Sequence, residues 1–254
     1  VSPPPPPITL GDPVSAKSIL LFDIQSLLPR AELNPYRILP IASLTKIMTG
    51  FAALSVLKPD TLIEISDTAL LAEGTAGDFT AGEVFTLRDL LRAMMMYSSN
   101  DAAAAIAEAV ERHIKKGFVS LMNEKAAALG MRNTVFWNPT GLDLFDKTPS
   151  NFSSAEDLAR LIAHTSTSTP ILWELSRDSK FVIFSNDLKS HHLLNLNTMM
   201  GDLPHFVGGK TGSTDIAGES LVLLFEDPLG RPQQPIAPQE SEPPYAVNTT
   251  LDRD

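Results

Sequence analysis

Hydrophobic residues recur along the chain with two spacings, and these predict a mixture of strands and helices. Short apolar runs of the kind that fills a buried strand lie at residues 18–23, 61–65, 181–184 and 220–225. Residues 27–33 are the candidate hairpin partner of the first run, although Pro29 disfavours a strand because proline has no N–H for the sheet. Apolar residues three and four positions apart follow Lys46, Thr86 and Phe118, which is the spacing of an amphipathic helix.

Polar residues before these helical stretches predict where the helices begin. Thr86 suits the N-cap of one helix. That helix runs into a tight bend, after which Asn100 or Asp101 is expected to cap a second helix rich in alanine. Ser153 and Glu156 have the spacing of a capping box, so another helix is expected to start there.

Composition excludes several classes of protein. The chain has 254 residues, of which 43% are hydrophobic, and this is enough for a sizeable core. The formal net charge of −10 argues against a nucleic-acid partner. The absence of cysteine excludes disulfides, cysteine nucleophiles and thiolate metal sites. No apolar run approaches the ~18 residues that a membrane-spanning helix needs.

Proline marks the predicted domain boundaries. Residues 3–7 are all proline, which favours a stiff polyproline II spacer, so a linker is expected over residues 1–14. From Arg231 onward the sequence is proline-rich and acidic, which predicts a disordered or truncated tail over residues 229–254. A single folded domain is expected over residues 15–228.

The candidate chemistry begins at Ser43 and Lys46, whose i, i+3 spacing places them on one face of a helix. In a dry site near another cation, the lysine loses its proton more readily than its ordinary pKa of about 10.4 allows. A neutral lysine can then accept the serine proton and make a nucleophile without histidine. The same spacing recurs at Ser55 and Lys58, but Pro59 stops the helix there, and a solvated lysine at a helix C-terminus is the better interpretation.

Two further short motifs follow in order. Ser98 and Asn100 form S-x-N in the bend between two predicted buried helices, where capping explains one polar residue better than it explains a cluster. Lys210, Thr211 and Gly212 form K-T-G, in which a cation and a hydroxyl stand beside glycines that allow close approach of a ligand. S-x-x-K, a serine-asparagine motif and K-T-G in this order are the signature of penicillin-binding proteins and class A β-lactamases.

The sequence around the motifs resembles the low-molecular-weight penicillin-binding proteins, and specifically the serine D-alanyl-D-alanine carboxypeptidases. The resemblance covers roughly residues 16–225 and is carried by the stretches 40–46, 86–91, 99–103, 122–126, 138–142 and 209–212. It implies a transpeptidase-like α/β (α+β) fold, with an antiparallel sheet flanked by helices, a helical subdomain, and the active site between them. It also implies removal of the terminal D-alanine from peptidoglycan stem peptides through an acyl-enzyme. β-Lactams would be covalent inhibitors, and neither a cofactor nor a metal is expected.

The resemblance assigns a role to each motif. Ser43 resembles the acylated nucleophile and Lys46 its base, while Ser98 would relay protons to the leaving amine. The substrate-binding residues would be Asn100, Lys210, Thr211, Gly212 and Ser213.

Within that substrate-binding set, Asn100 would hold the substrate peptide, and Lys210 with Thr211 would bind its terminal carboxylate. The backbone N–H groups of Ser43 and Ser213 would form the oxyanion hole.

Two features depart from the family pattern. The middle residue of S-x-N is often glycine in the family and is Ser99 in this chain. The family also adds a further strand and a helix after the strand expected at 220–225, whereas a proline-rich sequence follows here. This departure predicts an open sheet edge, with more consequence for stability than for chemistry.

Other functions remain open at the level of sequence. A D,D-endopeptidase acting on crosslinked peptidoglycan is the nearest, because such relatives share all three motifs. A class A β-lactamase is less favoured, since no E-x-x-L-N pattern follows Asn100 to supply the deacylating glutamate. An inactive binding or scaffold domain is the alternative from another class. A Ser-His-Asp hydrolase is disfavoured because none of the five histidines lies in a G-x-S-x-G or related context.

The resemblance also implies a location outside the cytoplasm, either in the periplasm or at the cell surface. Any membrane tether is expected outside this chain.

Overall fold

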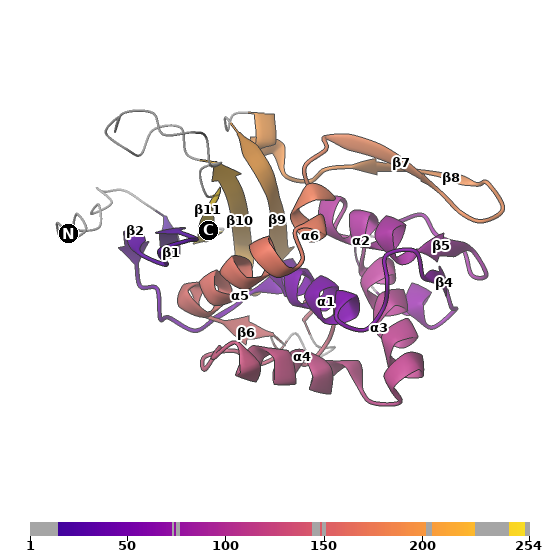
Figure 1. Ribbon diagram of the computed structural model, residues 1–254, viewed down its shortest axis with the longest axis horizontal. Helices are drawn as coiled ribbons and strands as arrows, with labels where there is room; N and C mark the ends of the chain where they lie inside the picture. The colour runs from indigo at the N-terminus through magenta and orange to yellow at the C-terminus, as the bar shows by residue number, and fades with distance from the viewer. Residues whose placement is uncertain are drawn as a thin grey trace.

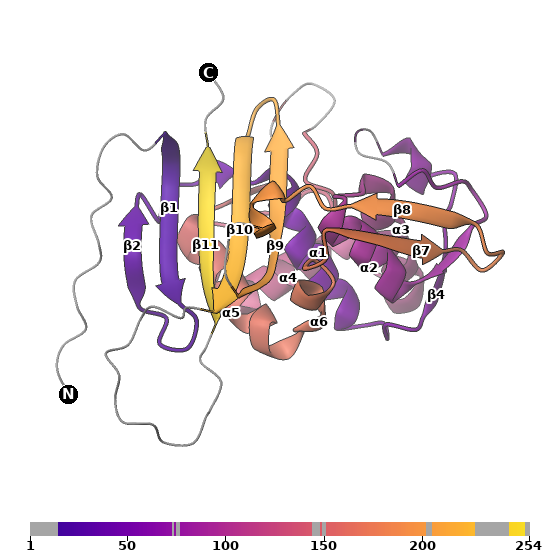
Figure 2. The same ribbon diagram turned by 90° about the horizontal axis from the view of Figure 1, so that it is seen from above.

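A computed structural model describes residues 15–72, 74, 77–143, 148, 151–201, 205–226 and 244–251. The architecture is α+β, as the resemblance implied, with a five-stranded sheet beside a helical region (Figures 1 and 2). The sheet has the order β2-β1-β11-β10-β9, and every neighbouring pair in it is antiparallel. Its strands are β1 (Ala16–Asp23), β2 (Pro29–Leu33), β9 (Phe206–Thr214), β10 (Gly218–Glu226) and β11 (Pro244–Leu251).

Helices pack against the sheet and against one another beside its β9 edge (Figure 2). They are α1 (Thr45–Leu54), α2 (Leu87–Met96), α3 (Asn100–Ile114), α4 (Phe118–Ala128), α5 (Ala155–Ser168) and α6 (Ile171–Glu174), with 3₁₀ turns η1 (Ala42–Leu44), η2 (Ala69–Leu71) and η3 (Thr198–Gly201). No helix in the described ranges is both long and apolar enough to cross a membrane.

Helix α1 lies at the centre of the fold, and this position explains its composition. Its first nine residues are all buried, including the polar residues Thr45, Lys46 and Thr49. The apolar spacing predicted one buried stripe, but helices α2, α3, α4, α5 and α6 all contact α1, so its whole circumference is enclosed. A helix that is buried all round keeps polar side chains only where they have partners.

In the part of the chain that the structure describes, three two-stranded pairs accompany the large sheet. They are β3 (Leu39–Pro40) with β6 (Phe152–Ser153), β4 (Leu62–Glu64) with β5 (Val84–Thr86), and β7 (Lys180–Phe184) with β8 (Ser190–Leu194). The β7–β8 hairpin runs alongside α2 toward β4 and β5 (Figures 1 and 2). Strand β8 carries two histidines and a serine, and for this reason its hydrophobic pattern did not predict it.

The expected open sheet edge is wrong, and so is the disorder predicted for all of residues 229–254. Strand β11 lies between β1 and β10 and pairs with both, for example through Val247 opposite Leu21 and opposite Leu223. The sequence of β11, PYAVNTTL, is rich in the β-branched and aromatic residues that favour strands. Residues 1–14 of the predicted linker, and residues 227–243 and 252–254 of the predicted tail, lie outside the described residues.

Most local predictions are confirmed, and two helix caps move by one residue. Thr86 caps α2 as predicted, but the N-cap of α3 is Ser99, whose hydroxyl accepts a hydrogen bond from Ala102 N at 3.1 Å. The cap of α5 is Ser154 instead of Ser153, and it accepts from Asp157 N at 3.2 Å. In both cases the sequence offers adjacent polar residues, and only the backbone conformation selects the cap.

The hairpin partner of β1 is also confirmed. Strand β2 begins at Pro29 and lies at the outer edge of the sheet. A proline is tolerated there because one side of an edge strand needs no sheet hydrogen bonds.

Candidate active site

The turn η1 presents Ser43 at the start of α1. Ala42, just before it, has a φ of 44°, in the left-handed region that only a few non-glycine residues adopt. Gly141 packs directly against this turn. A Cβ on Gly141 would lie 2.0 Å from the carbonyl oxygen of Ala42, so only glycine allows such close packing. Gly141 itself has a φ of 86° and ends a turn in which Asn138 Oδ1 accepts from its N–H at 2.7 Å. A strained backbone at Ala42 and the close packing of Gly141 therefore fix the serine.

Lys46 lies one helical turn below Ser43 and has no exposed surface. Its Nζ is 2.8 Å from Ser43 Oγ, 2.7 Å from Asn100 Oδ1 and 2.6 Å from the carbonyl oxygen of Thr140. A neutral amine has two N–H groups and one lone pair. Because the two carbonyl oxygens of Asn100 and Thr140 can only accept, they take both N–H groups and leave the lone pair directed at the serine hydroxyl.

Two effects favour this neutral form. Burial lowers the pKa of Lys46 well below its ordinary value of 10.5, because a charged amine in the interior loses its hydration. The positive charge of Lys210 lowers the pKa of Lys46 further. The S-x-x-K spacing predicted the contact with Ser43, and the structure places a second cation, Lys210, in the same site.

Ser98 and Lys210 form the second half of the site. Lys210 Nζ donates to Ser98 Oγ at 2.9 Å, across 112 residues of sequence. Ser98 has a φ of 60°, so the bend between α2 and α3 holds this residue in a left-handed conformation. Lys210 is only 1% exposed, and burial lowers its pKa to about 7.

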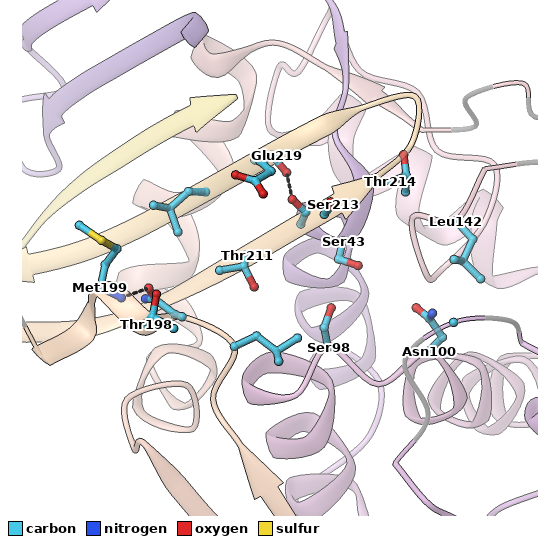
Figure 3. Close-up of a pocket in the computed structure, with 16 residues that line it drawn as sticks. Ser43, Ser98, Asn100, Leu142, Thr198, Met199, Thr211, Ser213, Thr214 and Glu219 are labelled. Carbon is cyan, nitrogen blue, oxygen red and sulfur yellow. Dashed lines mark hydrogen bonds between the residues drawn. The ribbon is translucent and has the colours of Figure 1, made fainter. Parts of the chain in front are cut away.

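Strand β9 brings the K-T-G motif against Ser43. A Cβ on Gly212 would lie 2.9 Å from Ser43 N and 2.6 Å from Ser220 Oγ, so only glycine allows this approach. Thr211 and Ser213, on either side of Gly212, line the same cavity as Ser43 (Figure 3). The backbone of β9 is therefore the edge along which a ligand at Ser43 would lie.

The cavity itself has a volume of about 570 Å³ and opens between β9, the α2–α3 bend and the segment after β8. Its lining includes the predicted residues Ser43, Ser98, Asn100, Thr211, Gly212 and Ser213. Lys46 and Lys210 reach this group of residues by hydrogen bonds to the two serines. All eight sequence-predicted site residues are thus brought together.

Other lining residues were not predicted from the sequence. The segment after β8 contributes Leu196, Asn197, Thr198 and Met199, and strand β10 contributes Glu219, Ser220 and Leu221. No motif marks the first group. The second could have been found from the antiparallel pairing of β10 with β9, which places Glu219 opposite Ser213.

Among the described residues, no group of three or more histidine, aspartate or glutamate side chains is placed to hold a metal ion.

Comparisons with known proteins agree with this geometry. The sequence model of the D-alanyl-D-alanine carboxypeptidase family matches residues 5–225. A D-alanyl-D-alanine endopeptidase of Pseudomonas aeruginosa is 36% identical over 236 residues, which cover 88% of this chain and 72% of that protein. The D-alanyl-D-alanine carboxypeptidase DacA of Haemophilus influenzae is 32% identical, and the match covers 82% of this chain and 53% of the relative, about half its length.

Solved structures show the same fold. Penicillin-binding protein D2 of Listeria monocytogenes, in its ampicillin-bound form, has a TM-score of 0.72 and 25% identity, covering 96% of this chain and 91% of the other.

Proposed function

Since the chain belongs to the D-alanyl-D-alanine carboxypeptidase family, we propose that it hydrolyses D-Ala-D-Ala termini of peptidoglycan stem peptides through an acyl-enzyme on Ser43. The observation that carries this proposal is the set of contacts at Lys46. Its two N–H groups have carbonyl acceptors at 2.7 and 2.6 Å, and its remaining position is 2.8 Å from Ser43 Oγ. The geometry suits a general base that is already neutral.

Acylation follows from these positions. Lys46 accepts the Ser43 hydroxyl proton while Oγ bonds to the carbonyl carbon of the penultimate D-alanine. The negative oxygen that forms would be stabilised by the backbone N–H groups of Ser43 and Ser213. As the C–N bond breaks, Ser98 donates its proton to the departing amine nitrogen, and the Lys210 ammonium that contacts Ser98 Oγ at 2.9 Å replaces that proton. The product is an ester on Ser43 and free D-alanine.

Deacylation reuses the same base. Once D-alanine has left, Lys46 gives up the proton that it took from Ser43, and Lys210 regains the proton that it gave to Ser98, both by exchange with water. A second water molecule then attacks the ester carbonyl while the neutral Lys46 accepts its proton, and that proton passes to Ser43 Oγ as the ester bond breaks. The site returns to its starting state and releases the shortened peptide.

Lys210 and Thr211 supply the recognition of the substrate's terminal carboxylate. In its protonated form Lys210 is a buried cation beside the hydroxyl of Thr211, and a carboxylate bound there gains far more than at an exposed lysine. Removing one partner of such a buried pair typically costs about 2–5 kcal/mol, against about 0–1 kcal/mol for an exposed pair. Asn100, which lines the cavity on the other side of Ser43, would hold the peptide backbone (Figure 3).

A D,D-endopeptidase is the second candidate function. The specific observation is the relative from P. aeruginosa, which is named a D-alanyl-D-alanine endopeptidase and is 36% identical. The two activities share the acylation step and differ in the leaving group, which is a free amino acid in one and a crosslinked peptide in the other.

β-Lactams would acylate the same serine, as the ampicillin-bound relative suggests. Enzymes of this family act on the cell wall, outside the cytoplasm. For this chain the periplasm or the cell surface is the proposed location, and any membrane tether would lie in sequence beyond this chain.

Intact-mass spectrometry after incubation with penicillin tests the proposal. One adduct is expected, on the peptide that contains Ser43. The matched control is Ser55→Ala, because Ser55 and Lys58 repeat the same spacing at an exposed helix end. Ser43→Ala should abolish the adduct and Ser55→Ala should leave it. An adduct on Ser55 or Ser98, or none on the folded protein, would remove Ser43 as the nucleophile.

A further inference from the structure

Among the described residues that line the active-site cavity, one side chain carries a charge, and it is acidic. The lining contains serines, threonines, asparagines, glycines and apolar residues, and Glu219 on β10 is the exception. Glu219 is half-buried and lies at the cavity beside β9 (Figure 3). An acidic residue here is unexpected, because the substrate proposed for this site ends in a carboxylate.

The sheet register gives the position of Glu219 relative to the carboxylate-binding residues. Glu219 is directly opposite Ser213, and Leu221 is directly opposite Thr211. Side chains directly opposite in an antiparallel pair share a face, with Cβ atoms about 4.5–5.5 Å apart, and diagonal neighbours lie about 7–8 Å apart. Glu219 therefore lies directly across from Ser213 on the neighbouring strand and diagonally across from Thr211.

The register also separates Glu219 from the buried cation. Gly212 opposes Ser220 and Lys210 opposes Val222, so these residues alternate onto the other face of the two strands. Lys210 and Ser220 are buried, whereas Glu219 is half-buried at the cavity. A carboxylate held at Thr211 and Ser213 would thus have the Lys210 ammonium behind it and the Glu219 carboxylate beside it.

We infer that Glu219 is a specificity-determining residue, which weakens the preference for leaving groups with a free carboxylate and admits those whose carboxylate is masked as an amide. The inference rests on the proposed function, because it concerns the leaving group of that reaction. Lys210 attracts the terminal carboxylate and Glu219 repels it, so the two residues set the acid-to-amide preference in opposite directions. A like charge at about 7 Å across a partly solvated site disfavours the anion by about 3- to 30-fold.

Two peptides that differ in one group test the inference. They are an acylated peptide ending in D-Ala-D-Ala and the same peptide with a C-terminal amide. The measured quantity is the ratio of kcat/KM for the acid to kcat/KM for the amide. In Glu219→Gln the ratio is expected to rise about 3- to 30-fold over wild type. In Lys210→Ala it is expected to fall.

The matched control is Glu226→Gln. Glu226 lies at the end of the same strand and is exposed, and it is not among the residues that line the cavity. Removing its charge changes the net charge of the protein equally, so the ratio should stay within about twofold of wild type. A ratio that does not rise in Glu219→Gln, or that rises equally in Glu226→Gln, overturns the inference.

The salt dependence of the ratio provides a second measurement, which is made first on the wild-type protein. Raising the ionic strength from about 0.05 to 0.5 M shortens the range of exposed charges. The wild-type ratio should increase, because the half-buried Glu219 is screened more than the buried Lys210, and Glu219→Gln should lack this increase. A wild-type ratio that falls with salt contradicts a repulsive Glu219.

The same peptides distinguish a failure of the inference about Glu219 from a failure of the proposed function. If penicillin acylates Ser43 but neither peptide is hydrolysed, then the D-Ala-D-Ala hydrolase proposal is wrong, and the inference about its leaving group fails with it. If both peptides are hydrolysed and the ratio ignores Glu219, only the inference fails.

Discussion

Two buried lysines with lowered pKa values divide the work of the site. Lys46 bonds to the carbonyl oxygens of Asn100 and Thr140, which fixes its lone pair on Ser43. Lys210 contacts Ser98 and has a pKa of about 7, so near neutral pH it exchanges between cation and amine. The first is suited to a base and the second to a proton donor and an anion-binding group, although the residue type is the same.

Replacing Lys46 by methionine should abolish acylation while keeping the fold. Methionine matches the length of lysine and suits a buried position, whereas the larger guanidinium of arginine has no room among contacts of 2.6–2.8 Å. Loss of a general base typically lowers the rate about 10²–10⁴-fold. Penicillin acylation rates measure the effect, with circular dichroism as the check on folding. Lys58→Met, at the exposed copy of the motif, should acylate like wild type, and a Lys46→Met variant that does the same would exclude Lys46 as base.

The pH dependence should differ between acid and amide peptides. Lys210 has its pKa lowered to about 7, so it is a cation below that pH and loses its proton as the pH rises through it. Carboxylate binding requires the cation, so kcat/KM for the acid peptide should fall relative to the amide above about pH 7. A bound substrate carboxylate stabilises the charged form of Lys210 and so raises its pKa in the complex. For the acid peptide, kcat should therefore begin to fall at a higher pH than kcat/KM does. A constant acid-to-amide ratio between pH 6 and 9 would separate Lys210 from the carboxylate.

Sequence reasoning reached these side chains because their motifs are short and local. Ser43 and Lys46 are one helical turn apart, so their contact follows from the helix alone. The Thr140 carbonyl comes from 94 residues away, and its contact depends on how the turn before α5 packs against α1. Backbone acceptors leave no mark on residue type, and for that reason this half of the lysine's environment was missed.

At the scale of elements, the turn at residues 138–141 supports Lys46, the proposed base. Its Thr140 carbonyl accepts from Lys46, and its Gly141 packs against the Ala42 carbonyl. The sequence indicated a turn from N-P-T-G but gave no reason for its place beside the nucleophile.

Gly141→Ala should therefore reduce both stability and acylation. The new Cβ would lie 2.0 Å from Ala42 O at a φ of 86°, so the turn and η1 must separate. Gly130→Ala is the matched control, because Gly130 has a φ of 72° and nothing within 4 Å of the added Cβ. The control should cost only the conformational strain of about 1–2 kcal/mol. Urea unfolding and penicillin acylation should both show a larger loss in Gly141→Ala, and equal losses would show that the contact with Ala42 has no effect.

Strand β11 was missed although its composition favours a strand. The prolines and acidic residues that precede it dominate the average of the segment, and eight residues of strand are too short to alter that average. Its place is decided by β1 and β10, each of which would otherwise have an edge without hydrogen-bond partners in the sheet.

Val247→Pro tests whether β11 contributes to the stability of the sheet. Val247 pairs with Leu21 on one side and with Leu223 on the other, so proline removes an N–H from a strand with neighbours on both edges. A loss of about 1–3 kcal/mol in the free energy of unfolding is expected, because a carbonyl of the neighbouring strand loses its donor inside the sheet. Val247→Thr keeps the N–H and the β-branch, and should cost much less. If both variants unfold at the wild-type urea concentration, β11 is not part of the stable sheet.

At the scale of the whole molecule, the buried lysines make the free energy of unfolding depend on pH in the alkaline range. Lys210 has a pKa of about 7 in the folded state and an ordinary value of 10.5 in the unfolded chain. Between these values the unfolded state binds the extra proton, so the free energy of unfolding rises with pH, and it levels off above 10.5. The full effect is on the order of 5 kcal/mol. Urea unfolding at pH 7 and pH 10 should show this rise in wild type, and Lys210→Met should lose the part that belongs to Lys210. A parallel rise in the variant would contradict this assignment.

The central position of β11 also sets an order for folding. Strand β1 begins at Ala16 and strand β10 ends at Glu226, and they are joined only through residues 244–251. During synthesis the N-terminal residues emerge first. Strands β1 and β2 and the helices can form contacts early, but the sheet closes only after the ribosome releases its middle strand. Contacts across more than 200 residues of chain form slowly because the loop that they close is long. The turn η1, which carries Ser43, packs against β9 at the edge of the sheet and therefore belongs to a part of the molecule that is completed late. Reactivity toward penicillin should appear only after β11 has docked between β1 and β10.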